Sequence, residues 1–446
     1  MLRVVVGAAA ARATVLKRIP FEQVQVPLTL ERSLERVFGR PLTPQEAVDE
    51  IIREVAGKGD TALLRYSELI DGIPLQNLQV GQEAIESAYC SVPEPLHKAL
   101  QLAAQRIRAF HEKQPVTSWL DWRSDGALGQ VIRPLERVGI YVPGGTAPLA
   151  SSLLMTAMPA RVAGVEEIIV CTPPQRDTGL PHQVVLAAAH VAGIRSVFAV
   201  GGAQAIAAMA FGTEIIPRVD KVVGPGNIFV VLAKKALFGI VGIESLPGPT
   251  ETLIIADDSA DPALVAADML AQAEHVLASA ILLTPSETLA EKVRSEIERR
   301  LRDDIGAHTA RESFANRGGI GICRDMDEAL LLANEYAPEH LCLLVADPWA
   351  LVPRARNAGG IFVGECASEA LGDYVVGPSH VMPTGGTARF ASPVNVWDFV
   401  KITSIFAPGP SEVADISDAG AVLAEAEGLT AHRQAILLRG GSTPER

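Results

Sequence analysis

The apolar positions of the chain recur with two different periods. Between Pro44 and Phe110 they return every three or four residues, which predicts helices. The dipeptide Thr43-Pro44 is typical of the start of the first of these helices. From Arg137 onward, short runs of β-branched residues alternate with alanine-rich helical stretches. This alternation predicts parallel strands joined by crossover helices.

The elements expected from residue 137 onward form two series. The first series has strands at 137–142, 167–171, 196–200 and 221–223, and helices at 151–162, 183–192, 203–211 and 228–237. The second series has strands at 253–255, 280–283 and 319–323. We therefore predict an α/β fold with two Rossmann-like parallel-sheet domains and small N- and C-terminal helical extensions.

A chain of 446 residues is too long for a single ordinary core. The expected parts are an N-terminal extension at 1–30, a first, discontinuous α/β domain at 31–140 and 252–393, a second α/β domain at 141–251, and a C-terminal segment at 394–446. In that last segment, a stretch rich in Pro, Gly and Ser after Ser404 precedes a final helix expected from Ala421 to Arg439.

The composition and charge of the chain indicate which kinds of molecule it can bind. Apolar residues make up 48% of the chain and charged residues 20%, as is typical of a globular protein. The net charge of −13 gives no reason to bind nucleic acid or an anionic membrane, and no stretch reaches the roughly 18 apolar residues of a membrane span. We expect a cytoplasmic protein with a small-molecule partner. The five cysteines form no CxxC pair, so any metal ligands are expected to be nitrogen and oxygen atoms.

Three of the expected strand ends carry glycines directly before a helix. They are Val142–Gly145, Val200–Gln204 and Val223–Asn227. Backbone N–H groups at a helix start can bind an anion, and glycine allows a ligand to approach closely. Three such turns along one sheet edge would suit a dinucleotide. Since none of them is the GxGxxG fingerprint, tight turns without a ligand are an equal alternative.

A helix is expected over residues 261–278, because Asp261 and Pro262 form a typical helix start. One line along this helix holds Val265, Met269, Gln272 and Val276. Gln272 therefore interrupts an apolar stripe, and His275 lies about one turn further along. The polar groups of this pair need partners, which are either ordinary hydrogen bonds or a shared metal ion.

Glu339 and His340 come directly before an expected strand at 341–345. Two adjacent groups of different pKa suit a reaction in which one takes a proton from an alcohol and the other from water. A surface Glu–His pair without a function is the alternative. Ligands of open α/β sheets favour the carboxyl ends of strands, whereas this pair precedes its strand.

Asp373 and His380 lie in a loop rich in Gly and Pro and are further candidates for ligands or acid–base groups. The alternative is that this loop is only a structural turn.

A series of longer motifs covers the chain from about Gly57 to Leu438. The motifs are YVPGG, GGAQAI, GPGN, QAEH, EYAPEHL, GDY, the run GP-x-HV-x-PTGGTARF, and Ala431-His432 in the final helix. In their order and spacing they resemble the histidinol dehydrogenase family. The resemblance implies the four-electron oxidation of L-histidinol to L-histidine through histidinal with two NAD, in histidine biosynthesis.

The resemblance also implies a zinc site and a homodimer. The implied zinc ligands are Gln272, His275, Asp373 and His432, the last of them donated by the other subunit. Zinc would anchor the imidazole and the amine of the substrate rather than generate hydroxide. The resemblance also implies that the domain at 141–251 binds NAD and that the C-terminal segment at 394–446 takes part in dimerisation.

The family pattern assigns roles to the remaining candidates. His340 would be the base for the alcohol, and Glu339 would activate the water that hydrates the aldehyde. Tyr141, Gln204 and Asn227 would contact NAD, and they lie at the three glycine-rich strand ends. The implied substrate contacts are Thr250, Gln272, His275, His340, Asp373, His380, Glu427 and His432.

Glu427, which is expected to cross the dimer interface with His432, bears on the choice of substrate. A carboxylate in the pocket favours a cationic amine and repels a sulfonate. This matters for the main alternative, a zinc- and NAD-dependent dehydrogenase of another small alcohol such as a sulfopropanediol. The second alternative is a non-catalytic binding protein of the same fold, and the presence of Glu339, His340 and all four ligand positions speaks against it.

Overall fold

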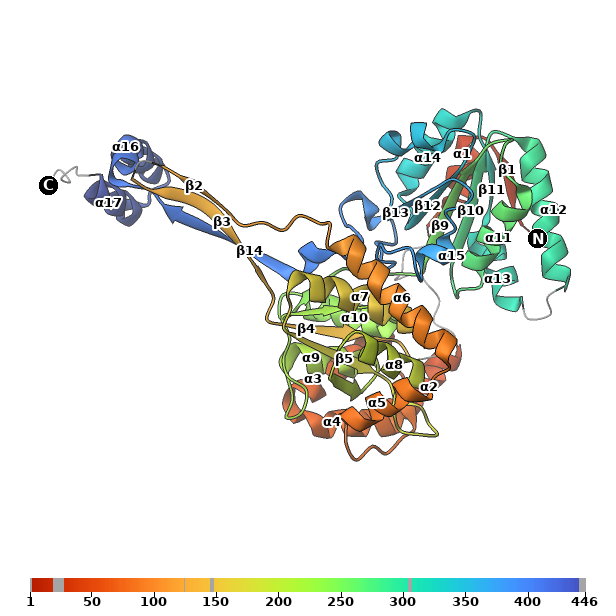
Figure 1. Cartoon of the computed structure of the whole chain (residues 1–446), viewed down its shortest axis with the longest axis horizontal. Coiled ribbons are helices and arrows are strands. Elements are labelled where there is room, and N and C mark those ends of the chain that lie inside the picture. The colour runs from red at the N-terminus through yellow and green to blue at the C-terminus, as the bar shows by residue number, and fades with distance from the viewer. Residues whose placement is uncertain (1, 19–27, 124, 145–147, 304–306, 441–446) are drawn as a thin grey trace. The chain divides into compact units, whose positions relative to one another are not determined.

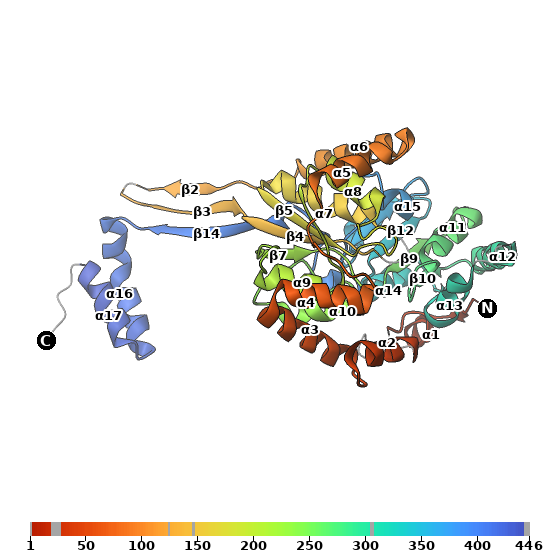
Figure 2. The ribbon, with the colours of Figure 1, turned by 90° about the horizontal axis from the view of Figure 1, so that it is seen from below.

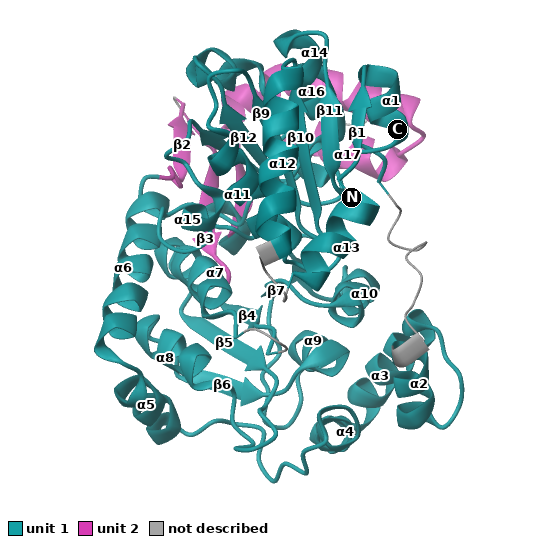
Figure 3. Ribbon diagram, turned by 90° about the vertical axis from the view of Figure 1, so that its right-hand side faces the viewer, with its two compact units in different colours: residues 1–113, 136–399 teal, residues 114–135, 400–446 magenta. Residues whose placement is uncertain are grey.

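The computed structural model describes residues 2–18, 28–123, 125–144, 148–303 and 307–440. Contacts divide the chain into two compact units, which are coloured separately in Figure 3. Residues 1–113 and 136–399 form unit 1, and residues 114–135 and 400–446 form unit 2. Within the described residues, no helix is long and apolar enough to cross a membrane.

A six-stranded parallel sheet forms one part of unit 1 (Figure 1). Its order is β1-β11-β10-β9-β12-β13. The strands are β1 (Val4–Val6), β9 (Glu251–Ala256), β10 (Ser279–Thr284), β11 (Gly319–Ile322), β12 (His340–Leu344) and β13 (Gly360–Val363). The helices that accompany them are α1 (Ala8–Ala13), α11 (Pro262–Ala273), α12 (Glu287–Asp303), α13 (His308–Arg317), α14 (Met326–Tyr336) and α15 (Glu369–Gly372). Short 3₁₀ turns follow at Pro348–Ala350, Val352–Arg354, Thr387–Arg389 and Val396–Phe399.

Both faces of this sheet are buried, because alternate residues of each strand point to opposite sides. Ile254 and Leu282 pack on one side in a cluster with side chains of α11, α12 and α13. Leu253 and Ile281 pack on the other side with side chains of α1 and α14. Two buried faces explain why these strands are continuous apolar runs rather than alternating ones.

A five-stranded parallel sheet forms the other part of unit 1, in the order β6-β5-β4-β7-β8. The strands are β4 (Arg137–Tyr141), β5 (Glu167–Thr172), β6 (Ser196–Ala199), β7 (Lys221–Val223) and β8 (Gly242–Ile243). The crossover helices are α7 (Ala150–Ala163), α8 (Gln183–Val191), α9 (Gly202–Phe211) and α10 (Ile228–Leu237). The preceding helices are α2 (Leu28–Phe38), α3 (Pro44–Lys58), α4 (Asp60–Tyr66), the π-helical turn Ser67–Asp71, α5 (Gln82–Ser91) and α6 (Glu94–His111).

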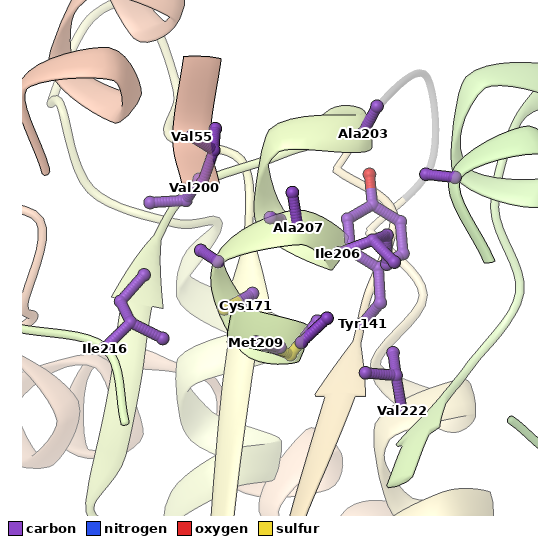
Figure 4. Packing of buried hydrophobic residues seen from close by; sticks show 14 of the residues in the cluster. Val55, Tyr141, Cys171, Val200, Ala203, Ile206, Ala207, Met209, Ile216 and Val222 are labelled. Carbon is purple, nitrogen blue, oxygen red and sulfur yellow. The ribbon is translucent and has the colours of Figure 1, made fainter. Parts of the chain in front are cut away.

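The helices before the five-stranded sheet share its core. Figure 4 shows Val55 of α3 beside Val200, and both belong to one buried cluster with Ile206 of α9 and Val222 of β7. The start of α3 is fixed locally, since Thr43 and Glu46 form a reciprocal capping box. The N-terminal helical region is therefore packed against the sheet.

The predicted α/β fold class with two parallel sheets is confirmed. Each strand expected between residues 137 and 323 exists, with small differences at the ends. The division into domains stays a prediction, but the strand pairing adds two facts to it. Strand β1, which lies in the expected N-terminal extension, pairs with β11. Helices α3 and α4 were expected in the discontinuous domain of residues 31–140 and 252–393, but their side chains pack in the cluster of the five-stranded sheet.

One predicted helix is shorter than expected. Helix α11 ends at Ala273 rather than near residue 278. Leu277 has a positive φ of 62°, so the chain leaves the helix and turns into β10 at Ser279. Val276 consequently does not continue the apolar stripe, and its side chain is 76% exposed.

Unit 2 is built on an antiparallel sheet that the sequence pattern did not indicate. Its strands are β2 (Trp119–Trp122), β3 (Ala127–Pro134) and β14 (Val400–Ala407), which run alongside one another in Figure 2. The single final helix expected from Ala421 to Arg439 is instead two helices, α16 (Pro410–Ala426) and α17 (Thr430–Arg439). Gly428, with φ of 73°, lies in the turn between them.

Candidate functional site

Glu339 and His340 lie at the amino end of β12, which pairs with β9 on one side and with the edge strand β13 on the other. His340 is in register with Thr252 of β9 and with Gly360 of β13. The site is therefore formed where three neighbouring parallel strands begin. Glu339 and His340 thus lie at the amino ends of the strands, whereas ligands of open α/β sheets usually bind at the carboxyl ends. Gln272 of α11 and Glu369 of α15 contact the start of β9 on the same side.

A chain of hydrogen bonds fixes the carboxyl group of Glu339. Thr250 Oγ1 donates to Glu339 Oε2 over 2.5 Å, and the backbone N–H of Glu251 donates to the same oxygen over 3.0 Å. Gln272 Nε2 in turn donates to Thr250 Oγ1 over 2.9 Å. The start of β9 and the end of α11 thus hold this carboxyl group from two sides.

Burial raises the pKa of Glu339 to about 7, and the nearby His340, the Thr250 hydroxyl and the Glu251 N–H oppose this shift. The carboxyl group is consequently close to half ionised at neutral pH. A base poised in this range can accept a proton from water and release it again. The environment of Glu339 therefore suits general base catalysis.

The imidazole of His340 is buried, and neither ring nitrogen has a hydrogen-bond partner among the described residues. Its Nδ1 lies 3.8 Å from Glu339 Oε2 and 3.5 Å from Glu369 Oε1. Unpartnered polar atoms are rare in protein interiors and indicate a place for a ligand or a proton transfer. His340 thus has two carboxyl groups near its Nδ1, and its Nε2 makes no hydrogen bond with either of them.

Sequence reasoning missed Glu369. Its side chain is buried, and Thr252 donates a hydrogen bond to its Oε2. Burial raises the pKa of Glu369 to about 8, and the Thr252 hydrogen bond opposes the shift. One signal was available: Glu369 lies four residues before Asp373, which is one helical turn.

His380 links the Gly-rich loop to the start of α7. Its Nδ1 lies 2.8 Å from the Asp373 backbone oxygen and 3.7 Å from the Asp373 carboxylate, and its Nε2 lies 3.0 Å from Ser152 Oγ. Burial lowers the pKa of His380, so the imidazole is neutral at pH 7. Ser152, in the first turn of α7, is a second residue that the sequence did not single out.

The predicted zinc ligands fall into two groups. Gln272 and His275 lie at the end of α11, which contacts α15, and Asp373 caps the end of α15. The amide nitrogen of Gln272 is bound to Thr250, which leaves the amide oxygen for another ligand. His432 in α17 and Glu427 at the end of α16 belong to unit 2, and both side chains are exposed.

Zinc requires about four nitrogen, oxygen or sulfur ligands. No group of three or more His, Cys, Asp or Glu side chains suited to a metal occurs within the described residues. The predicted ligand set takes only His275 and Asp373 of those types from unit 1, together with the amide of Gln272, and it stays a prediction. The residues of unit 1 fit three of the four ligand positions by their chemistry.

The glycine-rich strand ends lie together at the carboxyl edge of β4 and its neighbours. The Tyr141 hydroxyl accepts a hydrogen bond from the Gly202 N–H over 3.1 Å, and burial raises the pKa of Tyr141 to about 12. Gln204 is buried, and neither atom of its amide has a partner in the described part of the chain. Asn227 Oδ1 caps α10 by accepting from two backbone N–H groups. Gly145 lies outside the described residues.

Unpartnered amide atoms and helix starts at a sheet edge are features of a polar ligand site. Tyr141, Gln204 and Asn227 therefore fit a nucleotide on structural grounds as well. Unit 1 contains two chemically different places: proton-transfer groups at the amino edge of one sheet, and nucleotide-type turns at the carboxyl edge of the other.

Comparison with known proteins points to one family. A family model described as histidinol dehydrogenase matches residues 41–440. The histidinol dehydrogenase of Deinococcus radiodurans is 51% identical over 434 residues, which cover 97% of this chain and 98% of that protein. That of Thermus thermophilus is 50% identical over 398 residues, which cover 89% and 95% of the two chains. The crystal structure of histidinol dehydrogenase from Elizabethkingia anophelis superimposes with a TM-score of 0.86 at 32% identity, covering 98% of each chain.

The raised pKa of Glu369 predicts a pH dependence of stability. In the folded chain this group keeps its proton up to a pH of about 8, whereas an unfolded glutamate loses it near its ordinary value of 4.5. The stabilisation is fully present below pH 4.5 and is lost as the pH rises through about 8, at roughly 1 kcal/mol per pH unit. Glu369→Gln should remove this contribution, so that stability falls less steeply between pH 5 and pH 8, while the raised pKa of Glu339 keeps its own smaller contribution. The free energy of unfolding of the metal-free protein, measured between pH 5 and pH 8, checks it.

A matched control is Glu86→Gln, whose side chain is exposed on α5. This variant should follow the wild-type profile. If Glu369→Gln also loses stability with rising pH as steeply as the wild type, the buried protonated state of Glu369 is contradicted.

Proposed function

The chain belongs to the histidinol dehydrogenase family, and on this premise we propose that it oxidises L-histidinol to L-histidine through histidinal, with zinc bound at the site and NAD as acceptor of both hydrides. As a member of that family it is an oxidoreductase of histidine biosynthesis. The observation that carries the mechanism is the buried pair Glu339 and His340, in which one group is held by hydrogen bonds and the other has free nitrogens.

His340 is the base of the first oxidation. The alcohol must lose its hydroxyl proton as the carbon-bound hydrogen leaves as hydride, and these two losses give the aldehyde. A buried imidazole with a free nitrogen can take that proton. Glu369, 3.5 Å from Nδ1 of the same ring, supports the orientation in which the other nitrogen faces the substrate.

Glu339 is the base of the second oxidation. Water adds to the aldehyde carbon and passes a proton to Glu339, while the carbonyl oxygen takes up a proton. The resulting hydrate then loses a second hydride from its carbon and a proton from one hydroxyl group, which gives the carboxylic acid. A carboxyl group with a pKa of about 7 is partly ionised at neutral pH and can accept the proton of the attacking water. The hydrogen bonds from Thr250 and Glu251 hold one of its oxygens in place.

The zinc ligands are Gln272, His275 and Asp373 from one subunit and His432 from a second subunit. When bound, zinc supplies a Lewis-acidic anchor for the imidazole and amine nitrogens of the substrate. The end of α11, which is fixed by the Gln272–Thr250 hydrogen bond, connects these ligands to Glu339. Substrate binding and proton transfer are thereby aligned by one set of hydrogen bonds.

Tyr141, Gln204 and Asn227 would hold NAD, which would supply the hydride acceptor of each oxidation. The unpartnered amide of Gln204 and the protonated Tyr141 hydroxyl support this assignment, because both can hydrogen-bond to ribose or phosphate oxygens. Ser152, which contacts His380, lies in the first turn of the helix that follows the first glycine-rich strand end. It connects the nucleotide side of unit 1 with the substrate side.

The substrate is further selected by Thr250, His380 and Glu427. Neutral His380 lines the site without adding charge. Glu427 adds a negative charge, which favours the amine of histidinol and disfavours a sulfonate. This charge pattern favours histidinol over the diol sulfonates.

We propose a homodimer in which unit 2 forms much of the interface and donates Glu427 and His432. Unit 2 has large apolar side chains in water, including Trp122 at 76% exposure and Phe406 at 81%. Apolar surface of this kind marks protein interaction sites. The cytoplasmic location stays a prediction.

The direct test is an assay of the purified zinc-loaded protein with NAD. L-histidinol should give NADH and L-histidine, whereas a sulfopropanediol should give no NADH above background. NADH formed only from the sulfonated diol would support the alternative substrate class. No NADH from either compound would support a non-catalytic binding protein.

The shared site predicts complementation between two inactive variants. His340→Ala lacks the base and His432→Ala lacks the ligand donated across the interface, so each homodimer should be inactive. In a mixed dimer, one of the two sites is built entirely from intact residues. Co-refolding the two variants should restore up to about a quarter of wild-type activity, because half of the dimers are mixed and each has one intact site. No recovery in a sample shown to contain mixed dimers would contradict the donation of His432.

A further inference from the structure

Lys234 and Glu244 form an ion pair that is completely enclosed by the protein. Their side chains are 0% and 3% exposed, and Lys234 Nζ lies 2.7 Å and 2.9 Å from the two carboxylate oxygens of Glu244. Burying two charges is costly, and replacing such a pair with apolar residues is often neutral or stabilising. Stability alone therefore does not account for the pair.

Both members of the pair bind the same residue of the β7–α10 turn. Lys234 Nζ donates to the backbone oxygen of Gly224 over 2.6 Å, and Glu244 Oε1 accepts from the Gly224 N–H over 2.8 Å. All three donors of the ammonium group are consequently used inside the protein. The ion pair fixes both backbone polar groups of Gly224 at once.

Gly224 occupies a position that no other residue could take. Its φ is +118°, and a Cβ there would lie 2.1 Å from the backbone oxygen of Tyr141. The hydroxyl of Tyr141 in turn accepts a hydrogen bond from the Gly202 N–H, at the start of α9. Three residues further along the turn, Asn227 caps α10. The ion pair thus holds a turn that packs directly against Tyr141, and the hydroxyl of Tyr141 connects this turn to the start of α9.

We propose that Lys234 and Glu244 are positioning residues for NAD, which hold the β7–α10 turn in the shape that presents Asn227 and supports Tyr141. This inference rests on the proposed function, since it takes these strand ends as the NAD site. Because both side chains are buried behind the turn, they act through Gly224 and not by touching the cofactor.

The test uses the double variant Lys234→Met/Glu244→Leu in the zinc-loaded protein. It removes the clamp on Gly224 without leaving an unpaired buried charge, so the unfolding temperature should stay near that of the wild type. Its Kd for NAD, measured by calorimetry without substrate, should rise at least about tenfold, because a displaced turn loses hydrogen bonds to the cofactor. The Kd for histidinol and the kcat at saturating NAD should stay within about twofold of wild type.

Two further variants make the result decisive. Glu244→Gln keeps the shape of the acceptor but leaves Lys234 unpaired, and it should weaken NAD binding in the same direction. Arg137→Met breaks the ion pair between Arg137 and Glu167, which lies at the amino ends of β4 and β5, away from the glycine-rich turns at the carboxyl ends. This variant should leave the Kd for NAD unchanged.

The inference is overturned if the folded double variant binds NAD as tightly as the wild type. It is also overturned if NAD and histidinol lose affinity in equal proportion, since that would indicate a general structural role. A wild-type protein that binds no NAD at all would contradict the proposed function itself.

Discussion

A buried carboxyl group at the amino edge of a parallel sheet is the constraint on which the site depends. Glu339 cannot ionise in an apolar interior unless donors compensate for the lost water. The first residues of β9 supply them through the Thr250 hydroxyl and the Glu251 N–H. The register between β9 and β12 therefore determines the chemistry, because a slip of one residue would turn every side chain of the strand to the other face.

The two parallel sheets of unit 1 carry different functional groups, one at the amino ends of its strands and the other at the carboxyl ends. Amino ends of the six-stranded sheet carry the groups that exchange protons, and carboxyl ends of the five-stranded sheet carry the turns suited to a nucleotide. The contact of Ser152 with His380 joins the two inside one unit. A hydride transfer needs this arrangement, since donor carbon and acceptor must meet while the proton leaves on another side.

Local signals predicted most of the fold and part of the site. Strands β4 to β7 were predictable because short β-branched runs lie between glycine turns, and α10 was predicted with its exact bounds. The end of α11 was not predicted, because the positive φ of Leu277 is set by the entry into β10.

Glu369 and Lys234 were missed for a related reason. Their partners lie in other elements, at Thr252 and at Glu244, and nothing local marks the contact. The sheet of unit 2 was missed since β2 is exposed at every position and shows no alternation.

His340 and Glu339 serve different proton transfers, the first from the alcohol and the second from water. This division is tested by the amount of NADH formed for each histidinol consumed by Glu339→Gln, with a carbonyl-trapping reagent present. We expect one NADH and one trapped aldehyde for each histidinol, because the first oxidation keeps its base and the second loses the group that activates water. Two NADH for each histidinol, formed at the wild-type rate, would contradict it.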